Sequence, residues 1–193
     1  MIPSTPNKSR RVTTSRPFLT TKELALTALM TAVTCILGPL SIPLPFSPVP
    51  VTFTNLAIYF SIYVLGMRKG TISYIVYFLL GLVGLPVFSG FAGGPGKITG
   101  PTGGYLIGFF FLSLISGCFI DRWHAKKVMA AAGLVLGSAV CYLFGTLWLS
   151  RQLSISFAAG LGTGVLPYLP GDIIKIIIAV IAGPKLRKAV NHF

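Results

Sequence analysis

Charged residues are scarce in this chain of 193 residues. They make up 10% of the sequence, only three of them are acids, and 53% of all residues are apolar. A soluble domain carries about 25% charged residues, so these charges are too few to cover a water-facing surface. Disorder is also excluded, because 12% of the residues are aromatic and disordered chains contain few aromatics. The composition predicts an integral membrane protein.

Cysteine and the usual catalytic groups are nearly absent as well. The three cysteines, Cys35, Cys118 and Cys141, lie singly in apolar stretches, without the paired spacing of a zinc or redox site. His124 and His192 fall in a connector and in the C-terminal tail, so no span holds a Ser-His or Cys-His pair. We therefore expect no enzyme, no metal site and no cofactor.

Six apolar segments approach the roughly 20 helical residues that a bilayer core of about 30 Å requires. They run from Leu24 to Leu40, Val51 to Gly66, Gly70 to Phe88, Gly104 to Ile120, Lys127 to Leu149 and Gly164 to Gly183. A glycine-rich connector, 89–103, separates the third from the fourth. The prediction is an all-α membrane protein with six transmembrane helices in residues 23–188, a basic flexible tail at 1–22 and a short tail at 189–193.

Lysine and arginine are distributed unevenly between the two sides of such a bundle. Thirteen of the sixteen fall on the side that carries both termini, whereas the connectors of the other side hold only Lys97 and Arg151. Positively charged connectors stay in the cytoplasm. Both termini are therefore predicted to be cytoplasmic, in a multi-pass protein of the cell membrane. Cations scattered over short connectors also argue against nucleic-acid binding.

The acid Asp172 lies inside the sixth predicted span, unlike Glu23 and Asp121, which lie at span ends. Lys175 follows three residues later, so both side chains share one helical face. A charge at membrane depth costs on the order of 2.5 to 3.5 kcal/mol and usually faces a cavity or another charge. Two interpretations stay open: a self-neutralising pair that joins two helices, or a pair that lines an outward-facing polar pocket.

Small residues form a strip on the first span, at Ala25, Ala28 and Ala32. Such a strip lets another helix approach closely. Gly133 and Gly137 in the fifth span have the same four-residue spacing, and there we expect packing within the chain.

Four segments in order along the chain carry a resemblance to one family. They are the proline-rich run 41–52, Gly-Leu-Val-Gly-Leu-Pro-Val-Phe at 81–88, Gly-Pro-Thr-Gly-Gly-Tyr at 100–105 and Leu-Pro-Tyr-Leu-Pro-Gly-Asp-Ile-Ile-Lys at 166–175. They resemble the BioY family, the biotin-binding S components of energy-coupling-factor (ECF) vitamin transporters. The resemblance covers roughly residues 24–185.

The resemblance implies a six-helix bundle that captures biotin from outside. It also implies association with a transmembrane coupling subunit and two ATP-binding subunits, which power release into the cell. Ala28 and Ala32 match the strip that docks to the coupling subunit, and the glycine-rich loop matches an extracellular lid. Gly96-Lys97 lacks the Gly and the Ser or Thr that complete a phosphate loop, so ATP hydrolysis by that route would fall to the partners.

Biotin has a ureido ring with two N–H donors and a carbonyl, an apolar bicycle and chain, and a carboxylate. A pocket with one acid, one base and apolar walls satisfies these groups. Asp172 could accept the ureido N–H bonds or fix Lys175, and either Lys175 or Lys97 could pair with the carboxylate. The expected substrate-binding residues are Asp172, Lys175, Lys97, Tyr105, Gly103, Thr102, Asn55 and Phe88.

One position departs from the family. Thr54 stands where we expect a Gln, which leaves the contacts from the second helix open. Other functions also stay open: an S component for another vitamin, a biotin facilitator without partners and, from different classes, a membrane enzyme or a scaffold.

Overall fold

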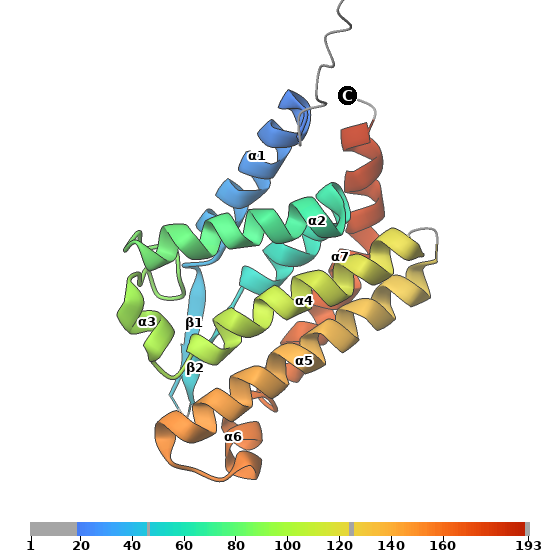
Figure 1. Ribbon diagram of the computed structural model, residues 1–193. Coiled ribbons are helices and arrows are strands. Elements are labelled where there is room, and N and C mark those ends of the chain that lie inside the picture. The colour runs from blue at the N-terminus through green and yellow to red at the C-terminus, as the bar shows by residue number, and fades with distance from the viewer. Residues whose placement is uncertain (1–18, 46, 124–125, 192–193) are drawn as a thin grey trace, which may run out of the picture.

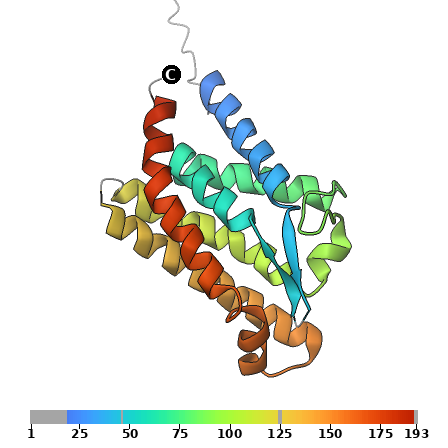
Figure 2. The ribbon, with the colours of Figure 1, turned by 180° about the vertical axis from the view of Figure 1, so that it is seen from behind.

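The computed structural model describes residues 19–45, 47–123 and 126–191 and is predominantly helical (Figure 1). The termini of the described chain, at the start of α1 and the end of α7, lie at the same end of the molecule (Figures 1 and 2). The predicted all-α fold is confirmed only in part, because the described chain is mostly helical but also contains two β-strands. Most of the two predicted tails falls outside the described residues. The elements are α1 (Thr21–Leu37), β1 (Ser41–Leu44), β2 (Ser47–Thr52), α2 (Thr54–Leu82), α3 (Pro95–Thr99), α4 (Gly103–Arg122), α5 (Lys127–Leu153), α6 (Phe157–Gly164) and α7 (Leu169–Asn191).

Helix α1 lies three residues earlier than the predicted span from Leu24 to Leu40. It begins with a capping box, in which the Thr20 hydroxyl accepts from the Glu23 N–H and the Glu23 carboxylate accepts from the Thr20 N–H. It ends before Gly38-Pro39, because Gly38 still has helical backbone angles but Pro39 has no N–H with which to continue the helix. The polar cap lies outside the apolar run on which the prediction was based.

Helix α2 contains the second and third predicted spans, separated by a break at Gly66. Gly66 has φ +79°, a conformation that favours glycine, and the chain turns back on itself there (Figure 1). The break frees the N–H of Met67, which donates to Asp121 Oδ2 at 2.7 Å. Asp121, at the end of α4, also pairs with Arg187 of α7. This carboxylate therefore joins three helices where the chain turns.

The outer ends of these two spans were predicted wrongly. Val51 lies in strand β2, so α2 begins at Thr54. At its other end α2 stops at Leu82 rather than Phe88, because Gly84 takes φ +111° and Pro86 follows.

The proline-rich connector forms a β-hairpin, which the sequence analysis did not predict. Strands β1 and β2 pair antiparallel, with Ser41 opposite Thr52, Ile42 opposite Val51 and Leu44 opposite Ser47. Proline has no N–H to donate. In a sheet of two strands, each strand has a free edge that such residues can occupy. The hairpin lies beside the middle of the bundle, between α2 and α6 (Figure 2).

The sixth predicted span, from Gly164 to Gly183, is also displaced. Residues 157–164 form the short helix α6, and α7 begins only at Leu169, with Pro170 in its first turn, where a proline fits without breaking a hydrogen bond. At its other end α7 continues through Pro184 to Asn191, past the boundary predicted at residue 188. By contrast, α4 and α5 begin within one residue of their predictions and extend two and four residues beyond them.

Among the described residues, α4 and α5 are the two helices long and apolar enough to cross a membrane. The pair α6 and α7, bent by 58°, would make a third if it counts as one span. Helix α1, with 17 residues, lies at the lower limit for a span. Length and composition thus support a membrane protein, while the count of six spans stays a prediction.

Glycines bring α4 and α5 into close contact. A Cβ built on Gly133 would lie 2.3 Å from Phe119 Cβ, and one on Gly137 would lie 2.5 Å from Ser116 Oγ. Both contacts are between α5 and α4, so the expectation that this strip packs within the chain is confirmed.

We predict that Gly133→Ala destabilises the protein. The added methyl would lie 2.3 Å from Phe119 Cβ, so we expect a cost in the upper part of the range of about 1–3 kcal/mol for overpacking, which exceeds the helix-propensity gain of about 1 kcal/mol. Thermal unfolding of the purified protein in detergent should show a lower Tm. Gly162→Ala is the control, since nothing lies within 4 Å of the added atom. Equal Tm values for the two variants would contradict the tight α4–α5 contact.

Candidate functional site

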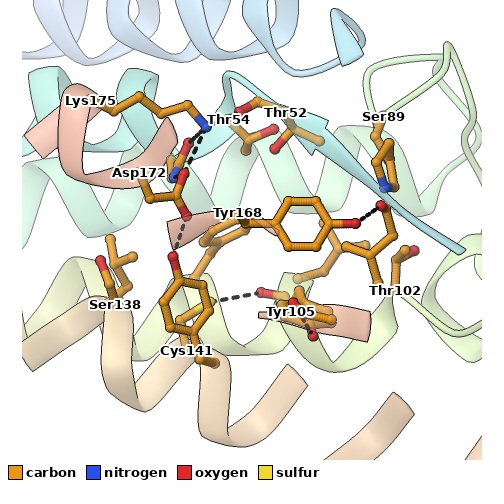
Figure 3. Close-up of a pocket in the computed structure, with 18 of the residues that line it drawn as sticks. Thr52, Thr54, Ser89, Thr102, Tyr105, Ser138, Cys141, Tyr168, Asp172 and Lys175 are labelled. Atoms are coloured by element: carbon orange, nitrogen blue, oxygen red, sulfur yellow. Dashed lines mark hydrogen bonds and ion pairs between the residues drawn. The ribbon is translucent and has the colours of Figure 1, made fainter. Parts of the chain in front are cut away.

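A cavity opens between the hairpin and helices α2, α4, α5 and α7 (Figure 3). About 70 Å³ of it is open to the centres of water molecules, several times the space that one water needs. Its wall combines aromatic and aliphatic side chains with hydroxyls and a single acid and base. The lining residues are Val49, Pro50, Thr52, Thr54, Asn55, Tyr59, Tyr77, Ser89, Thr102, Tyr105, Leu106, Phe109, Leu112, Ser138, Cys141, Tyr142, Gly164, Tyr168, Asp172 and Lys175.

Asp172 and Lys175 form a buried ion pair at one end of the cavity. Lys175 Nζ lies 2.8 Å from Asp172 Oδ1, and the two residues are 7% and 8% exposed, respectively. Both come from the first two turns of α7, three residues apart on one face. A carboxylate in the first turn of a helix is also stabilised by the helix dipole.

Neighbouring elements complete the hydrogen bonding of this pair. Lys175 Nζ also donates to the Thr52 carbonyl at 2.7 Å and to Asn55 Oδ1 at 3.2 Å, so its three N–H donors each have an acceptor. Asn55 Nδ2 donates to Asp172 Oδ1 at 2.8 Å, and the Tyr142 hydroxyl donates to Asp172 Oδ2. The two interpretations of the pair are therefore compatible, because the pair both lines the cavity and joins α7 to β2, α2 and α5.

Tyrosines tie the rest of the wall together. The Tyr168 hydroxyl, just before α7, lies within hydrogen-bonding distance of the Val49 carbonyl and, at 2.8 Å, of Ser47 Oγ, which holds β2 over the cavity. The Tyr105 hydroxyl on α4 donates to the Gly164 carbonyl at 2.8 Å. Figure 3 shows Asp172 and Lys175 on one side of Tyr168, and Ser89 and Thr102 on the other. The cavity therefore has a charged end and an uncharged polar end.

Five of the eight substrate-binding residues expected from the sequence lie together in the wall: Asn55, Thr102, Tyr105, Asp172 and Lys175. Thr54, which departs from the family pattern, lines it too.

The other three expected residues are not among the described lining residues. The Phe88 side chain is fully buried, with its ring edge-on to Tyr77 at 5.6 Å between centroids. Gly103 begins α4 and packs directly against the Ile98 carbonyl. Lys97 is half-buried on α3, where burial lowers the pKa of its ammonium group below the usual value.

The polar wall residues that sequence reasoning missed include Tyr59, Ser138, Tyr142 and Tyr168. Tyr168 lies within the Leu-Pro-Tyr-Leu-Pro segment that carries the family resemblance, so the sequence could have indicated it as a site residue. The other three lie in long apolar spans, and only the packing of α2 against α5 brings the Tyr59 and Ser138 hydroxyls to 2.7 Å.

Comparisons with known proteins agree on one family. The model described as "BioY family" matches residues 8–192. A protein of Pyrococcus horikoshii described as a probable biotin transporter BioY is 37% identical over 166 residues, which cover 86% of this chain and 96% of the relative. A biotin transporter BioY of Rhizobium etli is 34% identical over 174 residues, with 86% and 92% covered.

A solved structure resembles the fold as well. It is the crystal structure at 2.1 Å of the S-component for biotin from an ECF-type ABC transporter, which matches with a TM-score of 0.81 and 36% sequence identity. The match covers 86% of this chain and 91% of that chain.

We predict that Tyr168→Phe loosens the hairpin. The lost hydroxyl ties β2 to the start of α7, and a hydrogen bond of this kind contributes about 1 kcal/mol, so backbone amides of residues 47–52 should exchange with solvent about fivefold faster. Hydrogen exchange followed by mass spectrometry measures this. Tyr105→Phe is the control, because its hydroxyl bonds Gly164 instead. Unchanged exchange in Tyr168→Phe would show that other contacts hold the hairpin.

Proposed function

The chain belongs to the BioY family, and from this membership we propose that it takes up biotin as the substrate-binding S subunit of an ECF-type transporter. The cavity carries this proposal: a buried acid, base and amide at one end, with aromatic walls and hydroxyls leading away from them. This arrangement complements a small molecule with a compact polar head and an apolar body.

We propose that the ureido ring of biotin lies at the charged end. Among the described lining residues Asp172 is the single acid and Lys175 the single base, and at 2.8 Å they neutralise each other. A carboxylate beside them would be a second buried anion without its own cation, which is costly. The neutral ureido group instead offers N–H donors to Asp172 and a carbonyl to Lys175 or Asn55.

The carboxylate of biotin would then point to the opposite end, toward Ser89 and Thr102. Lys97, on the neighbouring helix α3, is the cation that we propose for this end. Helix α3 is held in place from α5, because Trp148 Nε1 donates to the Gly100 carbonyl at 2.9 Å and Gln152 Nε2 to the Thr99 carbonyl at 2.8 Å. The segment that closes this end is therefore anchored on one side.

We propose six membrane spans, formed by α1, the two halves of α2, α4, α5 and α7, with the termini in the cytoplasm. The end that holds the start of α1 and the end of α7 carries nine described cations, against two acids. Positive charge accumulates on the cytoplasmic side. The hairpin, α3 and α6 then face outward, so the cavity receives biotin from outside.

The exposed face of α1 supports docking to a transmembrane coupling subunit, which would act with two ATP-binding subunits. Ala25, Ala28 and Ala32 are all exposed. The opposite face of α1 is already used, since Thr31 packs on α2 with its hydroxyl 3.0 Å from Ser73 Oγ. A strip of small residues that is free within the subunit can admit a partner helix.

Removing the charges at the charged end of the cavity should weaken biotin binding. We predict that the single variant Lys175→Met and the double variant Asp172→Asn/Lys175→Met each weaken biotin affinity at least tenfold. The reason is that a charged hydrogen bond contributes about 1.5–3 kcal/mol. The double variant avoids leaving one buried charge unpaired, which could unfold a single variant. Calorimetric titration of the purified protein with biotin measures the affinity.

Arg151→Met is the matched control, because Arg151 is an exposed cation that does not line the cavity. It should bind biotin as the unaltered protein does. A folded double variant with unchanged biotin affinity would contradict the proposed site.

Enlarging the strip on α1 should separate transport from binding. We predict that Ala28→Leu leaves biotin affinity unchanged but reduces co-purification with the coupling subunit severalfold, because the bulkier side chain prevents close helix approach. Ala139→Leu, at an exposed position on α5, is the control. Normal biotin uptake by Ala28→Leu in cells without a coupling subunit would instead support a facilitator.

A further inference from the structure

A second cleft lies away from the hairpin, at the end of the molecule that holds the start of α1 and the end of α7. It is lined by residues from the start of α1, the break of α2 and the end of α7, and about 260 Å³ of it is open to the centres of water molecules. Figures 1 and 2 show the start of α1 and the end of α7 approaching each other at this end, with the turn of α2 below them. None of its lining residues belongs to the cavity described above.

The polar part of this cleft carries a net positive charge. Lys22, Glu23 and Lys69 line it, and Lys69 Nζ lies 2.8 Å from Glu23 Oε1. The other oxygen of the Glu23 carboxylate accepts from the Thr20 N–H, so both carboxylate oxygens already have partners. Within the described part of the chain no ion pair involves Lys22, which is exposed. One positive charge is therefore left over.

The remaining wall is apolar. Leu26 of α1, Val64 and Leu65 of α2 and Val190 of α7 line the cleft beside the lysines. A ligand that fits both parts has an anionic group next to a hydrocarbon portion. If this end of the protein lies at a membrane surface, such molecules are abundant around the cleft.

We propose that this cleft binds the phosphate headgroup of an anionic phospholipid, with Lys22 and Lys69 as its cationic ligands. Basic pockets between transmembrane helices at the cytoplasmic surface are suited to such headgroups. The apolar wall receives the glycerol and the first carbons of the acyl chains. The proposal goes beyond the proposed function and does not depend on which ligand the first cavity holds.

The test measures lipid binding to the full-length protein by native mass spectrometry after titration with phosphatidylglycerol or phosphatidylcholine. The unaltered protein should bind phosphatidylglycerol at least fivefold more tightly, and Lys22→Met/Lys69→Met should lose that preference. Glu23→Gln should bind phosphatidylglycerol at least as tightly as the unaltered protein, because it removes the negative charge although it breaks the same salt bridge. This last variant separates loss of a ligand from loss of structure.

Lys126→Met/Lys127→Met is the control for charge alone, since it removes two exposed cations at the start of α5. It should keep the preference. If both double variants lose the preference for phosphatidylglycerol equally, the proposal is overturned in favour of diffuse surface attraction. Saturation of the cleft by inorganic phosphate would overturn the lipid assignment. Should Lys22→Met alone leave lipid binding intact but weaken association with a coupling subunit, the cleft would be a protein interface instead.

Discussion

The burial of one acid and one base inside an apolar bundle is the constraint on which this structure depends. An isolated charge in such a place is too costly to persist, and a bare ion pair recovers only part of the cost unless further hydrogen bonds satisfy both groups. Asp172 and Lys175 obtain those bonds from Asn55, Tyr142 and the Thr52 carbonyl. The pair is therefore stable only where β2, α2, α5 and α7 converge.

That convergence also creates the cavity. Proline in the first turn of α7 and the bend from α6 place Tyr168 beneath the hairpin, whose strand β2 supplies both the Thr52 carbonyl and the Val49 carbonyl. The elements that hydrogen-bond to Asp172 and Lys175 at the charged end also enclose the rest of the cavity, which is lined by aromatic side chains. A ligand that enters finds its polar partners already held in place, so little ordering remains to oppose binding.

Much of the fold could be predicted from composition and spacing. Apolar runs located the starts of α4 and α5 to within one residue, and the isolated pair Asp172 and Lys175 indicated a site on the last helix. The hairpin could not be predicted, because alternating prolines argue against strands unless both strands are edges. The start of α1 at Thr21 depends on capping, and the start of α7 at Leu169 depends on a proline in the first turn. Hydropathy detects neither feature.

The composition of the cavity wall was harder to predict than its position. Tyr142 and Ser138 lie among apolar residues of α5, and nothing in their spacing distinguishes them from hydroxyls that face a neighbouring helix. Phe88 and Gly103 lie in segments that carry the family resemblance, yet in the structure they do not line the cavity and pack instead against Tyr77 and the Ile98 carbonyl. Sequence motifs identify the segments around a site, whereas side-chain direction decides which residues reach it.

The position of biotin in an experimentally determined structure of the complex tests the central claim most directly. The account predicts the ureido ring within hydrogen-bonding distance of Asp172 and of Asn55 or Lys175, with the carboxylate directed toward Thr102. Biotin bound outside the cavity, or bound in it with its carboxylate against Asp172, would contradict the account.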